Sequence, residues 1–146
     1  MTMNKNQQKM AQYGYTINNV MSRTDELQDE LNPLFIQLRE AIDNNKVDDF
    51  KKDDYEDIRS KFAAGTAEYA EMLKKFESAQ VPARFIGNHK LLTKAFASFV
   101  EGCQQMTDSL GDDKQIDVDS FNAAEKQQDE ASEKVSKFLN KIQVLV

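Results

Sequence analysis

Residues 10–38 read MAQYGYTINNVMSRTDELQDELNPLFIQL. In this stretch apolar side chains recur every three or four residues, with one threonine in the series. That spacing places them along one face of a helix, as in a coiled coil. The positions are Met10, Tyr13, Ile17, Val20, Thr24, Leu27, Leu31, Leu34 and Leu38. The stretch predicts one long helix with a narrow apolar seam.

Three later stretches show the same spacing. Their seams are Tyr55, Ile58, Phe62, Thr66, Tyr69, Leu73 and Phe76; then Phe85, His89, Leu92, Phe96, Phe99, Cys103, Met106 and Leu110; then Phe121, Ala124, Gln128, Ala131, Val135, Phe138, Ile142 and Leu145. We expect helices over about 5–43, 48–78, 84–110 and 118–144. The links between them are short, which favours antiparallel neighbours.

The pattern therefore predicts an all-α protein, an up-down-up-down antiparallel four-helix bundle that forms a single domain over residues 1–146. The first helix should be the longest, and Pro33 is its candidate kink because proline removes a helical hydrogen bond. Gly65 and Gly102 lie within the second and third helices, where they would allow two helices to approach closely.

Composition narrows the function classes. The 146 residues carry a net charge of -6 and no run of lysine or arginine, so nucleic-acid binding is not expected. The first ten residues contain no apolar leader segment, and no stretch resembles a transmembrane span. We expect a soluble cytoplasmic protein; the alternative is an extracellular or membrane-anchored one, if a leader precedes this sequence. Cys103 is the sole cysteine and cannot form an internal disulfide.

The residues that most often carry chemistry lie on the seams. A di-iron bundle needs Glu-x-x-His on two helices, but Ile86 stands three residues before His89, the sole histidine. The His-Glu-x-x-His spacing of zinc hydrolases is also absent. We therefore expect no metal and no cofactor, and His89 is interpreted as a structural residue bonded to Tyr13.

Antiparallel counting places four polar seam residues near one level of the bundle: Thr24, Thr66, Cys103 and Gln128. A buried polar layer usually fixes the register of a bundle. The alternative is a small-ligand pocket at the same level. Cys103 has no histidine near it in sequence to activate its thiol, so no catalytic residue is predicted.

Charged and glycine-containing segments offer no further site. Five aspartates lie around residues 108–119, but their order does not match a calcium-binding EF-hand loop. No glycine-rich phosphate loop is present. Several glutamates fall outside the seams and are interpreted as charge on the outer face of the bundle: Glu68, Glu71, Glu125 and Glu133.

One apolar group exceeds the needs of a compact bundle. If the first two helices extend beyond the other two, their connection forms an exposed apolar tip suited to binding a partner. Its residues are Phe35, Leu38, Ile42, Val47 and Phe50. The alternative is that the last turns of the first helix cap the core.

The second half of the chain also resembles small helical proteins of low-GC Gram-positive bacteria, some of them lipoproteins. The residues concerned are Val81, Pro82, Ala83, Arg84, Phe85, His89, Leu92, Phe96, Phe99, Gly102, Met106, Ser109 and Leu110, with Phe121, Ala124, Gln128 and Glu130. The resemblance covers the last two helices and implies no catalytic residue. The lipobox of such lipoproteins is missing, as is the Trp-x-Gly turn of four-helix type VII secretion proteins.

These observations predict a non-enzymatic helical bundle that acts as a protein–protein interaction or structural module, with a protein partner or a second copy as its target. The alternative is a bundle that binds a small ligand in its polar middle layer.

Overall fold

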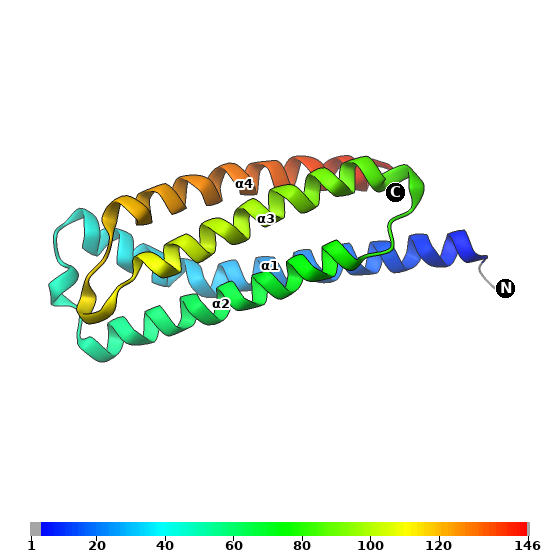
Figure 1. Cartoon of the computed structure of the whole chain (residues 1–146). Coiled ribbons are helices and arrows are strands. Elements are labelled where there is room, and N and C mark those ends of the chain that lie inside the picture. The colour runs from blue at the N-terminus through cyan, green and yellow to red at the C-terminus, as the bar shows by residue number, and fades with distance from the viewer. Residues whose placement is uncertain (1–3, 146) are drawn as a thin grey trace.

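The computed structural model describes residues 4–145, and within them four long helices run alternately up and down (Figure 1). They are α1 (Lys5–Asp43), α2 (Lys52–Ser78), α3 (Ile86–Ser109) and α4 (Val118–Leu145). No strand occurs in this range; two residues that flank the last loop form one isolated bridge. The prediction of an all-α four-helix bundle, with its first helix the longest, is confirmed.

Two helices begin later than the sequence predicts. Residues 47–49 and 83–85 form single 3-10 turns, so α2 starts at Lys52 and α3 at Ile86. Phe50 and Lys51 have extended backbone, with ψ of 137° and 143°, which separates the first turn from α2. Val47 and Phe50 keep the apolar spacing of a helix across this break. The sequence pattern therefore did not reveal that the helix is interrupted there.

Side-chain caps define two of the helix starts. The side chain of Asn4 accepts a hydrogen bond from the Gln7 amide at 2.8 Å, and the Gln7 side chain accepts one from the Asn4 amide. This reciprocal pair satisfies two backbone donors at the start of α1. Asp117 accepts a hydrogen bond from the Ser120 amide at 3.1 Å, as expected for the N-cap of α4.

The end of the bundle that holds the α1–α2 and α3–α4 loops, here called the loop end, is closed by its own core. Leu38 is fully buried and Ile42 is 9% exposed, in a cluster with Tyr55, Leu110 and Phe121. Three half-buried side chains pack against this cluster: Phe35, Val47 and Phe50. The expectation of an exposed apolar tip at Phe35, Leu38, Ile42, Val47 and Phe50 is therefore wrong, because the last turns of α1 complete the core.

Polar contacts hold the two loops of the loop end together. The Lys114 ammonium donates to the carbonyl oxygens of Asp48 and Phe50, each at 3.0 Å. The Tyr55 hydroxyl donates to the Gly111 carbonyl at 2.8 Å. The two Lys114 bonds span 66 and 64 positions of sequence and the Tyr55 bond spans 56, so the loop end is a fixed unit.

At the other end, His89 links three helices. Its Nδ1 lies 2.9 Å from the Tyr13 hydroxyl of α1, and its Nε2 lies 2.9 Å from the Phe76 carbonyl of α2. A carbonyl can only accept, so Nε2 carries the hydrogen, and in the neutral ring Nδ1 accepts from Tyr13. The predicted Tyr13–His89 bond is confirmed.

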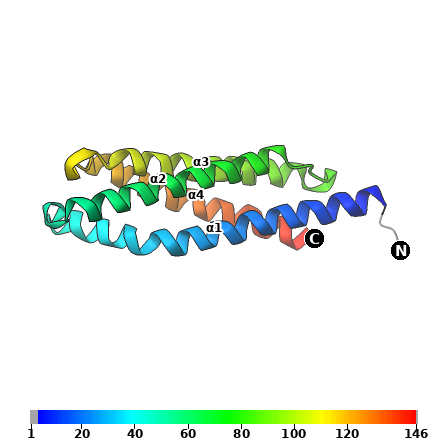
Figure 2. The same cartoon turned by 90° about the horizontal axis from the view of Figure 1, so that it is seen from below.

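Two glycines lie where a neighbouring helix leaves no room for a side chain. A methyl group on Gly65 would lie 2.7 Å from Leu31 of α1, and one on Gly102 would lie 2.9 Å from the Gln128 side chain and 3.3 Å from its backbone nitrogen. The predicted close approach of two helices is confirmed at Gly102, where α4 backbone atoms are near, whereas Gly65 makes room for the Leu31 side chain. Among neighbouring helices α3 and α4 pack most tightly and α1 and α4 least (Figures 1 and 2). Space is therefore left between α1 and α4.

Thr93 on α3 allows a test of how much an unpaired buried hydroxyl lowers the stability of the protein. Its hydroxyl is buried and is the one such side-chain atom without a hydrogen-bond partner in the described part of the chain. We expect Thr93→Val, which removes the hydroxyl and keeps the shape, to raise the free energy of unfolding by about 1 kcal/mol. Urea denaturation measures it. Thr107→Val is the matched control and should destabilise, because the Thr107 hydroxyl bonds Thr66 at 3.0 Å.

Candidate functional site

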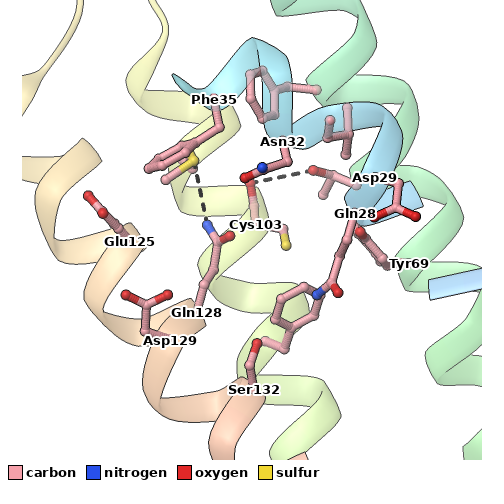
Figure 3. Close-up of a pocket in the computed structure, with 15 residues that line it drawn as sticks. Gln28, Asp29, Asn32, Phe35, Tyr69, Cys103, Glu125, Gln128, Asp129 and Ser132 are labelled. Carbon is pink, nitrogen blue, oxygen red and sulfur yellow. Dashed lines mark hydrogen bonds between the residues drawn. The ribbon is translucent and has the colours of Figure 1, made fainter. Parts of the chain in front are cut away.

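A cavity of about 360 Å³ opens between α1 and α4 halfway along the bundle, and all four helices contribute to its walls (Figure 3). Fifteen residues line it: Gln28, Asp29, Leu31, Asn32 and Phe35 of α1; Phe62, Thr66 and Tyr69 of α2; Phe99, Cys103 and Met106 of α3; and Glu125, Gln128, Asp129 and Ser132 of α4. The volume lies in the range of small-molecule sites in proteins, about 300–1,000 Å³.

Small residues on α4 explain why the space is not filled. Between Phe121 and Val135 the seam of α4 carries Ala124, Gln128 and Ala131, none of them a large apolar side chain. Gly102 lets this part of α4 lie directly against α3, where the Gln128 amide donates to the Gly102 carbonyl at 3.1 Å. Because α4 lies against α3, it stands away from α1 at this level, and no large side chain fills the space between α1 and α4.

The floor of the cavity is buried and mostly apolar. Tyr69 and Phe99 form an edge-to-face pair with ring centroids 5.1 Å apart. Thr66 is also buried, and its hydroxyl bonds the Thr107 hydroxyl at 3.0 Å, so it is satisfied by the protein itself. Burial raises the pKa of the Cys103 thiol to about 12. The thiol is therefore neutral at physiological pH and is not an activated nucleophile.

Tyr69 has a polar atom without a protein partner. The side chain is only 2% exposed, and its hydroxyl forms no hydrogen bond within residues 4–145. The hydroxyl is turned toward the opening (Figure 3). The other two buried tyrosines are satisfied, Tyr13 by His89 and Tyr55 by the Gly111 carbonyl. The Tyr69 oxygen is not one of the fully buried atoms that lack a partner, so solvent in the opening reaches it, and it is available to whatever fills the cavity.

The rim of the cavity is acidic. It carries the carboxylates of Asp29, Glu125 and Asp129, here called the carboxylate rim, and none of the fifteen lining residues is a lysine or arginine. Glu125 is half-buried and bonds the Arg39 guanidinium at 2.8 Å. Asp29 and Asp129 are exposed and form no ion pair within the described residues. Glu125, interpreted from the sequence as outer-face charge, keeps a side chain that is 33% exposed and also contributes to the rim of the cavity.

The cavity has a closed side and an open side along the bundle. Toward the loop end, Phe35 stacks on Phe121 with centroids 5.8 Å apart, and Arg39 reaches Asn122 at 2.8 Å. Toward the other end it continues into a smaller hollow of about 90 Å³, which shares Gln28, Phe99 and Ser132 with it and includes Thr24.

The predicted polar layer is thus found in part. Thr66, Cys103 and Gln128 line the cavity together, whereas Thr24 lies in the adjoining hollow and donates to the Val20 carbonyl at 2.8 Å. Sequence reasoning missed the hydroxyl of Tyr69 and the rim of Asp29, Asn32, Asp129 and Ser132. One sequence feature could have indicated the rim. Gln28 and Asn32 are polar residues beside the apolar seam of α1, and the seam of α4 at the same level carries small or polar residues.

Within residues 4–145 no group of three histidine, cysteine, aspartate or glutamate side chains is placed to hold a metal ion. In the same range no helix combines the length and apolarity needed to cross a bilayer. No protein-family model, curated protein or solved structure matches the chain.

Proposed function

We propose that this protein is a non-enzymatic binding protein that takes a small molecule into the cavity between α1 and α4. The observation that carries the proposal is a cavity of ligand size whose wall includes Tyr69, a side chain 2% exposed overall whose hydroxyl has no hydrogen-bond partner among the described residues. Binding sites typically combine apolar walls with a few placed polar groups, and this cavity has both.

The absence of reactive groups supports binding rather than catalysis. The Cys103 thiol is held neutral by burial, and both ring nitrogens of His89 are engaged in structural hydrogen bonds at the end of the bundle. No described cavity residue pairs a nucleophile with a base.

The alternative, a protein–protein interaction module, has less support on the described surface. Its exposed large hydrophobic side chains are spread over three helices and both ends of the bundle: Tyr15, Ile36, Ile86, Leu91 and Val118. Interaction sites more often form one contiguous apolar patch. The cavity is the more specific feature.

A screen with a blocked cavity tests the proposal. Ser132 is half-buried on the rim, so Ser132→Trp should fill the opening, whereas its exposed neighbour Glu133 lies outside the lining and Glu133→Trp is the matched control. We expect ligand-observed NMR on a fragment library to find compounds that bind the wild-type protein and Glu133→Trp but not Ser132→Trp. Circular dichroism checks that both variants fold. No binding compound, or equal binding to Ser132→Trp, would refute the proposal.

A further inference from the structure

We propose that the ligand is an organic cation, with an ammonium group at the carboxylate rim, an apolar body against the aromatic floor and a hydrogen-bonding group that reaches Tyr69. This inference rests on the proposed function and names the chemical class of the ligand.

The first step is the sign of the charge at the opening. Asp29 on α1 and Asp129 on α4 belong to helices on opposite sides of the opening, and neither has a cationic partner among the described residues (Figure 3). The two nearby arginines are engaged by carboxylates: Arg39 by Asp43 and Glu125, and Arg23 by Glu26, Glu30 and Glu68. The two carboxylates make the potential at the opening negative, which favours a cation there over an anion.

A second acceptor lies on the same turn of α1. Pro33 has no amide hydrogen, so it cannot donate the helical hydrogen bond that the Asp29 carbonyl would otherwise receive. The amides of Gln28 and Asn32 flank it on the rim. An ammonium group carries three donors and no acceptor, which suits a rim of carboxylates and carbonyl oxygens.

The interior selects against a bare metal ion. Below the rim the walls are Phe62, Phe99, Met106 and Leu31, and the described residues include no cluster of three metal-ligating side chains. An apolar body buried there gains from removal of its surface from water, and aromatic faces favour an adjacent cation. The cavity therefore fits a molecule that is charged at one end and apolar along its length.

The Tyr69 hydroxyl is the remaining polar group that a ligand in the cavity could contact. The Tyr69 hydroxyl has no hydrogen-bond partner among the described residues, and a hydroxyl can both donate and accept. A ligand whose far end carries a hydroxyl or carbonyl group would satisfy it. The organic cation is thus expected to have two polar ends.

Matched probes test the charge preference. Tyramine, tyrosol and 3-(4-hydroxyphenyl)propionate share a phenol and a two-carbon chain and differ in the end group, which is ammonium, hydroxyl or carboxylate. We expect calorimetry on the full chain to rank their affinities in that order. The double variant Asp29→Asn/Asp129→Asn should lower tyramine affinity about tenfold and leave tyrosol unchanged, while Tyr69→Phe should weaken both severalfold.

The control is Glu130→Gln, which removes an exposed carboxylate next to Asp129 that does not line the cavity. It should leave all affinities unchanged, and added salt should weaken only tyramine. If cavity ligands exist but tyramine binds no more tightly than tyrosol, or the double variant keeps full tyramine affinity, the cation assignment fails and the binding function stands. If probe binding is unaffected by Ser132→Trp, both proposals fail.

Discussion

Raising the pH above 9 should destabilise this protein progressively and unfold it as the pH approaches about 12. Burial raises the pKa of Cys103 from 9.0 to about 12, and those of Tyr13 and Tyr55 from 10.0 to about 12. Burial also raises the pKa of Tyr69. In this window the unfolded chain releases protons that the folded chain retains, so alkali favours unfolding.

The magnitude follows from the number of groups. Each proton released only on unfolding lowers the free energy of unfolding by about 1.4 kcal/mol per pH unit. Cys103 acts first, and three tyrosines contribute increasingly as the pH rises toward and above 10. Because a domain of this size is stable by about 5–15 kcal/mol, the combined effect is large enough to unfold it.

Urea denaturation at successive pH values measures the loss, with tyrosinate absorbance followed in parallel. Cys103→Ala is the informative variant, since it should remove most of the decline below pH 9 and about half of the decline between pH 9 and 10, and leave the steeper decline above pH 10. A free energy of unfolding that stays constant from pH 8 to 11 would contradict the assignment of these groups as buried and neutral.

The helices were predictable because their seams are regular. Periods of three and four residues identify each buried face from single side chains. The start of α2 was not predictable in this way. Val47 and Phe50 are apolar at helical spacing, and only the backbone geometry shows that they form a separate turn packed on the loop-end core.

The cavity was predictable only in outline. Three of its residues, Thr66, Cys103 and Gln128, stood out as polar residues on apolar seams. Tyr69 did not, because a seam pattern counts tyrosine as apolar and says nothing about where its hydroxyl finds a partner. The rim depends on the distance between α1 and α4. That distance is large because Gly102, which has no side chain, lets α4 pack closely against α3. Such distances follow from packing in three dimensions and not from spacing along one helix.

Replacing His89 by alanine is expected to lower the free energy of unfolding by about 3–5 kcal/mol. The side chain is 6% exposed and packs edge-on against Phe76 and Tyr13, so its removal leaves a cavity in the core. It also leaves the Tyr13 hydroxyl buried without an acceptor. Lys90→Ala, at the exposed neighbouring position, is the control and should change stability by less than about 0.5 kcal/mol.

A double-mutant cycle separates the hydrogen bond from the cavity. Tyr13→Phe removes only the hydroxyl and should cost about 1–2 kcal/mol, because Nδ1 of His89 loses its donor. Once His89 is alanine, the same substitution removes an unsatisfied hydroxyl and should cost little or even stabilise. The double variant must therefore cost less than the sum of the two single variants. Strict additivity in urea denaturation would mean that the bond contributes nothing to stability and that His89 acts through packing alone.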